Sequence, residues 1–184
     1  GISTATNVSV ASSVTAGTLF GNGAGLTGVS AGTLIRKSAY TISRQSISSN
    51  GFPQDDTIPQ ITEGTQFFSQ AYTPSTANCD LYIYCSAMIR ERTNVADTVG
   101  MGLFISDSTD ALRVVTEFMV GYGHGAQLYI YHKMPSWGAS AKTFSLRSHK
   151  ANSINYQSLY GGYPSEKFSQ AASESLFIIE EIAT

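Results

Sequence analysis

The side chains that could do chemistry in this 184-residue sequence include thirteen carboxylates. Hydrolysis of a glycosidic bond needs two carboxylates roughly 5–9.5 Å apart across a cleft. Glu180 and Glu181 are adjacent, so in a strand they point to opposite faces and make poor partners. Asp107 and Asp110 share one loop that could hold a cation, but calcium requires more oxygen ligands than this loop offers, so a solvated turn is favoured. The acids therefore do not predict a hydrolase.

The three histidines, His124, His132 and His149, lack the spacing of a metal site. His132 alternates with Leu128 and Ile130, which predicts a hydrogen-bonded imidazole in the core. His149 lies near the end of a candidate strand and is interpreted as a surface residue. An axial ion held by three copies of one histidine remains an alternative. The sequence also lacks a Gly-x-Ser-x-Gly elbow and a Walker loop, so we expect no catalytic residue, no metal and no cofactor.

Aromatic residues in turns point instead to binding, because sugars are held by aromatic faces with polar neighbours for their hydroxyls. Trp137 is the only tryptophan, and it lies in the turn Pro135-Ser136-Trp137-Gly138. It either contacts a ligand or closes one end of the fold or a subunit seam. The candidate ligand-binding residues are Trp137, Tyr160, Tyr163, Tyr122 and His124.

The elements that must position these residues are predicted to be strands almost everywhere after Phe52. Apolar and polar residues alternate cleanly in Asp80–Glu91 and Gln127–Met134. The other candidate strands are Gln66–Tyr72, Thr98–Ser106, Ala111–Val120, Ala141–Ser148, Asn152–Ser158 and Ser175–Ile182. Turn residues separate them, and no helix of four turns is expected. The pattern predicts an all-β chain, folded as an antiparallel β-sandwich of jelly-roll type.

Two of these strands carry aliphatic residues on one face and tyrosines on the other. Tyr82, Tyr84, Tyr129 and Tyr131 would therefore stand outward from the sandwich. Tyrosine is enriched at protein interfaces, and a monomer rarely displays a large aromatic patch. We interpret the four tyrosines as a subunit interface, with ordinary cross-strand tyrosine pairing on a half-wet face as the alternative.

Charge and cysteine content narrow the range of partners. The net charge is −2 and 13% of residues are charged, which does not fit a nucleic-acid or membrane surface. No apolar run is long enough to span a bilayer. Low charge suggests instead that oligomerisation hides part of the surface. Cys79 and Cys85 would lie roughly 20 Å apart in one strand, too far for a disulfide, and two free buried thiols fit assembly in a reducing cytoplasm.

The N-terminal part has a different composition and an internal repeat. Residues 1–54 contain no acid, and Val14–Leu19 is nearly repeated 15 positions later as Val29–Leu34. So short a motif cannot bury its own leucines and needs stacked neighbours or other copies of the chain. We divide the chain into a shaft at residues 1–50 and a sandwich head at 51–184. A flexible linker is the alternative for the first part.

Thr15–Val29 resembles the Gly-Asn-Gly-x-x-Leu-Thr-Gly repeat of bacteriophage tail fibre and tail spike proteins. Thr62–Phe68, Gly102-Leu103-Phe104 and Ser175–Ile182 also resemble segments of fibre-tip domains. The resemblance implies a homotrimer with a thin shaft and a β head that binds a bacterial surface polysaccharide or protein. It further implies that other virion tail proteins meet the missing N-terminal part. In such a trimer Leu19, Leu26 and Leu34 would pack against their symmetry mates.

The sequence therefore predicts a phage tail fibre tip, located in the virion and assembled in the host cytoplasm, that attaches to the host surface by binding without catalysis. Two alternatives stay open. The chain could be a tailspike-like polysaccharide depolymerase, although such spikes usually carry a much longer β-helix. It could also be a purely structural trimerisation tip or connector.

Overall fold

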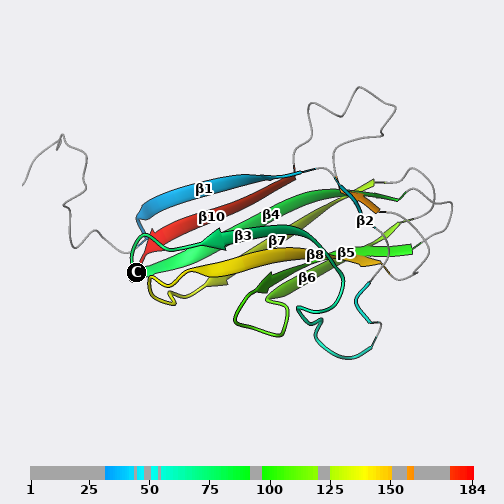
Figure 1. Cartoon of the computed structure of the whole chain (residues 1–184). Coiled ribbons are helices and arrows are strands. Elements are labelled where there is room, and N and C mark those ends of the chain that lie inside the picture. Colours follow the sequence, from blue (N-terminus) through cyan, green and yellow to red (C-terminus); the bar gives the residue numbers. More distant parts are fainter. Residues whose placement is uncertain are drawn as a thin grey trace, which may run out of the picture.

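The computed structural model describes residues 32–43, 45–47, 51–53, 55–91, 97–119, 125–150, 157–159 and 175–184. Within these ranges the chain forms strands and no helix (Figure 1). The strands are β1 (Leu34–Ile42), β2 (Gln45–Ile47), β3 (Thr65–Tyr72), β4 (Cys79–Glu91), β5 (Asp97–Ile105), β6 (Arg113–Met119), β7 (Gly125–Met134), β8 (Lys142–Lys150), β9 (Gln157–Leu159) and β10 (Ser175–Ala183). No helix long and apolar enough to cross a membrane occurs among the described residues.

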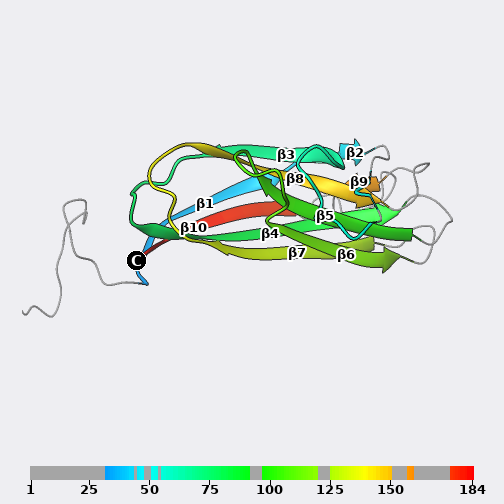
Figure 2. The same ribbon diagram turned by 90° about the horizontal axis from the view of Figure 1, so that it is seen from below.

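The strands form two antiparallel sheets that pack face to face (Figures 1 and 2). The larger sheet has the order β1-β10-β4-β7, and the smaller sheet has the order β3-β8-β5-β6. The short β9 pairs with β4 on the same edge as β10, and β2 pairs with β9, so these two strands extend the rows of β10 and β1. Two interleaved sheets of this order are the double Greek key of a jelly roll. The predicted jelly-roll sandwich is confirmed.

The core lies between the sheets and follows the predicted alternation. On β4, the residues Leu81, Ile83, Cys85, Ala87 and Ile89 are all buried. The smaller sheet meets them with Val99, Met101, Leu103, Ile105, Phe144 and Leu146. Each large apolar side chain buried in this way contributes about 1.5–3 kcal/mol relative to an exposed one. Cys79 and Cys85 are both free and buried, as expected.

The strand β1 extends the sandwich beyond its predicted limit. Leu34–Ile42 was expected in the shaft, but it pairs with β10 along its length, from Leu34 opposite Ile182 to Ile42 opposite Ser175. Its inward positions include Arg36 and Ser38, so the apolar alternation that marks β4 is missing here. The predicted division at residue 50 is therefore corrected, because β1 and β2 belong to the sandwich. The shaft segment before residue 32, with Leu19 and Leu26, lies outside the described residues.

The sandwich has two distinct ends. At one end, here called the entry end, Gly32 donates a hydrogen bond to the carbonyl of Ala183 at 2.8 Å. The turns at 73–78 and 135–141 lie at this end too, and Ser136 donates from its hydroxyl to the carbonyl of Ala77. The opposite end, called the far end, is where β4 and β6 finish and β7 and β10 begin (Figure 1). The described chain thus enters and finishes at the same end of the sandwich.

Part of the outer face of the smaller sheet is covered by residues 51–53 and 55–64, here called the strap. Its Phe52 is 5% exposed, and its ring stacks on His149 with centroids 5.4 Å apart. Phe104, an outward residue of β5, lies 6.0 Å from the same ring and is fully buried. The prediction that His149 is a surface residue is therefore wrong. An element 97 positions earlier in the chain buries it, which no local pattern around His149 signals.

Candidate self-association face

The outer face of the larger sheet gathers the predicted tyrosines in adjacent rows. In one row Ala39, Ile178, Tyr84 and Tyr131 stand opposite one another on β1, β10, β4 and β7. The next row contains Thr41, Leu176, Ser86 and Tyr129. Directly opposite residues in antiparallel strands point to the same side, so the pairing alone places these side chains on one surface. The sequence prediction that the tyrosines face outward is confirmed for this face.

Three of these tyrosines are exposed to solvent on the central strand β4 and the edge strand β7. Tyr129 is 68% exposed, Tyr131 is 52% exposed and Tyr84 is 39% exposed. The rings of Tyr84 and Tyr131 lie 5.1 Å apart, and Tyr82 lies 6.2 Å from Tyr131, so each ring already touches a neighbour. These contacts fix the rings in a contiguous aromatic surface rather than leaving them as separate side chains.

A shallow groove of about 250 Å³ opens between these tyrosines and the aliphatic residues of β10. Its lining is formed by Tyr84, Tyr129, Tyr131, Leu176 and Ile178, with Cys85, Ser86 and Ile130 at its floor and sides. None of these residues carries a carboxylate. Burial raises the pKa of the Tyr84 phenol, so its hydroxyl stays neutral. The groove can therefore hold apolar or aromatic groups, but it offers no acid–base pair for hydrolysis.

Ion pairs border the groove on the side nearer the entry end. Lys37 on β1 contacts Glu180 on β10 at 2.8 Å, and Lys133 on β7 contacts Asp80 on β4 at 2.8 Å. The hydrogen bond that Lys133 donates to Asp80 raises the pKa of Lys133, whose ammonium also lies 5.5 Å from the centre of the Tyr82 ring. An apolar centre beside a charged border is the usual composition of a protein interface.

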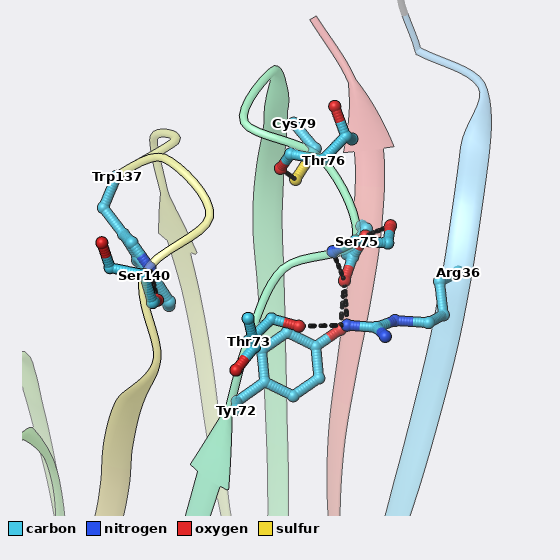
Figure 3. A network of polar contacts seen from close by, with 9 residues as sticks. Arg36, Tyr72, Thr73, Ser75, Thr76, Cys79, Trp137 and Ser140 are labelled. Carbon is cyan, nitrogen blue, oxygen red and sulfur yellow. Dashed lines mark hydrogen bonds and ion pairs between the residues drawn. The ribbon is translucent and has the colours of Figure 1, made fainter.

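A second polar cluster anchors β1 at the entry end (Figure 3). Glu181 points inward from β10 and is fully buried. It accepts hydrogen bonds from the hydroxyl of Tyr72 at 2.7 Å and from the N–H of Ser75 at 3.1 Å, and it forms an ion pair with Arg36. Burial by itself would raise the pKa of Glu181, but the bonds from Ser75 and Tyr72 and the charge of Arg36 outweigh it and lower that pKa. Burial and the carboxylate raise the pKa of Tyr72 to about 12.

This cluster holds three elements together and leaves no group free to react. Arg36 also donates from its guanidinium to the carbonyl of Thr73 at 2.6 Å and to the hydroxyl of Tyr72 at 3.2 Å. The carboxylate therefore fixes β1 and the turn at 73–78 to β10. Sequence reasoning grouped Glu181 with Glu180 as a poor catalytic pair, and it missed the structural role because Arg36 lies 145 positions away.

Trp137 lies at the entry end and packs against the core. Its ring is 5.7 Å from that of Phe144, its indole N–H donates to the carbonyl of Ser140 at 2.8 Å, and the Lys142 ammonium lies 5.1 Å from the ring centre. Lys142 in turn pairs with Asp107, and this hydrogen bond lowers the pKa of that carboxyl. These contacts favour the alternative that Trp137 closes one end of the sandwich.

The other predicted ligand residues fall outside the described residues. These are Tyr122, His124, Tyr160 and Tyr163. The described residues nearest to them in the chain, Met119, Gly125 and Leu159, lie at the far end. The ligand-binding role of these four residues stays a prediction.

Metal binding gains no support from the described part of the chain. Asp107 is paired with Lys142 instead of facing Asp110 across a cation site. His132 is half-buried on β7, and burial, followed by the charge of Arg113, lowers its pKa. No group of three or more histidine, cysteine or carboxylate side chains able to hold a metal ion occurs among the described residues.

No family model matches the chain, and no curated protein is similar to it in sequence. Among solved structures, it is similar to a protein chain in the structure of the infectious bursal disease virus Gx strain. The identity is 11% and the TM-score 0.42, over 81% of this chain and 36% of that one. It is also similar to the EclA C-terminal domain, a sugar-binding protein, at 14% identity and a TM-score of 0.37, over 75% and 81% of the two chains.

A third similar structure is the CBM36-1 domain of a multidomain xylanase from the hindgut metagenome of Trinervitermes trinervoides. Its identity is 11% and its TM-score 0.36, over 78% of this chain and 96% of that one. The chain spans about a third of the length of the viral protein. At these identities and TM-scores the similarity to solved structures does not indicate what this chain does.

Proposed function

We propose that this chain is the head of a homotrimeric phage tail fibre tip, which attaches the virion to a bacterial surface glycan or protein without catalysis. The observation that carries the proposal is the aromatic outer face of the larger sheet. Tyr84, Tyr129 and Tyr131 expose a contiguous apolar surface that a monomer would leave in water.

A second copy of the chain is the occupant that best fits this face. The Gly-Asn-Gly repeat before residue 32 resembles the shaft of trimeric fibres, and the described chain starts at the entry end beside Gly32. Three shafts running together would hold three sandwiches side by side at high local concentration. Leu34 and Ile35, which are 51% and 40% exposed at the start of β1, would then continue the contact of the shaft leucines.

The groups that line the groove support attachment without catalysis. The groove presents tyrosines and aliphatic residues but no carboxylate, so a depolymerase has no acid–base pair there. Three heads on one fibre would multiply individually weak contacts with a repeating surface glycan into tight attachment. Such a protein would act as part of the virion.

The trimer is tested by the mass of the protein in solution. At micromolar concentration, sedimentation or light scattering should give the mass of three chains. The double variant Tyr129→Ala/Tyr131→Ala should shift the population towards one chain, because tyrosines are enriched among the few interface residues whose truncation costs about 2 kcal/mol or more. Phe118→Ala is the matched control, since Phe118 is 62% exposed on the smaller sheet and should leave the mass unchanged. A well-folded single chain in the unmodified protein would contradict the proposal.

Attachment is tested separately with host cells and their surface polysaccharide. The labelled trimer should adsorb to cells in a saturable way and should release no new reducing ends from the polysaccharide over hours. Sustained release of reducing ends would support the depolymerase instead. A stable trimer that adsorbs to no cell would support the structural connector. If the tyrosine variant keeps its mass but loses adsorption, the aromatic face binds the glycan itself.

A further inference from the structure

We propose that the strap is held on the smaller sheet by a proton-sensitive contact at His149, and that acid releases it. The inference does not depend on the oligomeric state or on the receptor. It rests on the geometry of one buried imidazole and on the glycines that make room for it.

The contact between the strap and His149 requires a neutral imidazole. The backbone N–H of Phe52 donates to Nδ1 of His149 at 3.0 Å, and His149 is 6% exposed. A ring nitrogen accepts a hydrogen bond only when it carries no proton. Protonation would place a second donor against the Phe52 N–H and would leave a charge in a dry position, which is costly.

The surrounding backbone is shaped to hold the ring of Phe52 on the imidazole. The two rings are nearly parallel, at 11°. A Cβ atom on Gly102 would lie 2.9 Å from the Phe52 ring, and one on Gly64 would lie 2.6 Å from it. Glycines on β5 and at the end of the strap thus form a socket that fits this one side chain. A socket of this kind makes docking of the strap specific.

The strap is otherwise held by few bonds. Ala111 donates to the carbonyl of Pro59 at 2.8 Å, and Ile61 donates to the carbonyl of Thr109 at 2.7 Å. Arg147 donates to the carbonyls of Glu63 and Gly64 at 3.2 Å and 2.9 Å. Loss of the Phe52 anchor would therefore free the first half of the strap and uncover Phe104.

The charged groups around His149 favour release on protonation. Arg147 precedes it by two positions on the same face of β8, and its positive charge opposes a second one. On β5 and β6, the residues at this level are Gly100 and Thr116, which do not ionise. The strap carries Asp55, Asp56 and Glu63. Asp55 accepts bonds from Thr57, Glu63 accepts one from the N–H of Gln60, and Asp56 is exposed to solvent.

The sign of the pH dependence follows from proton linkage. The docked strap binds one proton fewer at His149 than the released strap, so its stability is complete at neutral pH and falls as the pH drops through the range where histidine titrates. The equilibrium constant for opening should rise by about tenfold per pH unit at the steepest point. Acids titrate at lower pH, which separates their effect from that of the imidazole.

Hydrogen exchange of the full chain tests the proposal. Between about pH 7.5 and 5, after correction for intrinsic exchange rates, the protection of the Phe52 amide should fall by tenfold or more, while the core amide of Ile83 should keep its protection. His149→Asn is the matched variant, because its side-chain oxygen can accept from Phe52 but cannot titrate. In this variant the protection should be independent of pH.

Three results would overturn the proposal. One is constant protection of the strap in the unmodified protein across this range. Another is an equal loss of protection in His149→Asn, which would assign the effect to a different group. The third needs no variant: if imidazole NMR shows His149 titrating at a pH different from the midpoint of strap release, the two events are not linked.

Discussion

At the scale of single residues, the adjacent acids Glu180 and Glu181 show how the same side chain takes different roles on the two faces of a strand. Glu180 points outward and pairs with Lys37 in a solvated position. Glu181 points inward, is fully buried, and is satisfied by Arg36, Tyr72 and Ser75. Surface ion pairs contribute little to stability, whereas breaking a buried pair leaves a charge and several donors without partners.

Glu181→Ala is therefore expected to lower the free energy of unfolding by about 3 kcal/mol, and Glu180→Ala by less than about 1 kcal/mol. Urea unfolding followed by circular dichroism measures both. Equal losses in the two variants would show that the Arg36 cluster does not anchor β1.

The same carboxylate predicts how stability depends on pH. Because the native cluster lowers the pKa of Glu181, this group contributes its full stabilisation above its unfolded pKa, and the contribution is lost as the pH falls through the native pKa. Below about pH 4.5, the free energy of unfolding of Glu181→Gln should therefore fall less steeply with decreasing pH than that of the unmodified protein. A profile unchanged by the substitution would contradict this assignment.

At the scale of elements, the strands with clean alternation could be predicted from the sequence, and those with polar inward residues could not. The inward and outward faces of β4 and β7 could be predicted because buried apolar residues occupy every second position, such as Leu81 and Ile83 on β4 and Ile130 on β7. In β1 the inward residue Arg36 finds its partners on β10, on β3 and in the turn after β3, all far away in the sequence, so the local pattern gives no sign of the strand. The burial of His149 could not be predicted for the same reason, because the residue that covers it, Phe52, belongs to a segment far away in the sequence.

Substitution of two glycines with positive φ would distinguish two effects on the free energy of unfolding: that of a left-handed backbone and that of a crowded Cβ atom. Gly64 has φ of 65° and lies against Phe52 and the carbonyl of Ser148, whereas Gly138 has φ of 86° and open space around it. Gly138→Ala should cost about 1 kcal/mol, the price of a left-handed backbone alone. Gly64→Ala should cost about 3 kcal/mol because the strap must also move. Thermal unfolding of the two variants measures the difference, and equal costs would mean that the strap yields freely.

At the scale of the whole molecule, the sandwich is completed by a strand from the region that composition assigned to the shaft. β1 covers one edge of β10 and supplies Arg36 to the buried Glu181. The aromatic face and the jelly-roll class could be predicted from periodicity. The extent of the domain could not, because Leu34–Ile42 lies in a region that resembles a linker in composition, although this strand pairs with the C-terminal strand.

A chain shortened to residues 51–184 should therefore fail to fold cooperatively, whereas one beginning at residue 32 should unfold in a single transition. The shorter chain loses β1 and β2, exposes an edge of β10, and leaves Glu181 buried without its cation. Thermal melts followed by near-ultraviolet circular dichroism compare the two. A cooperative melt of the shorter chain would restore the boundary at residue 50.

The meeting of Gly32 and Ala183 at the entry end has a practical consequence for handling the protein. A label, bead or sensor surface coupled after Thr184 would emerge beside Gly32 and would leave the far end pointing into solution. Immobilisation at this position would thus present the far end of the sandwich, where β4 and β6 finish, to a binding partner.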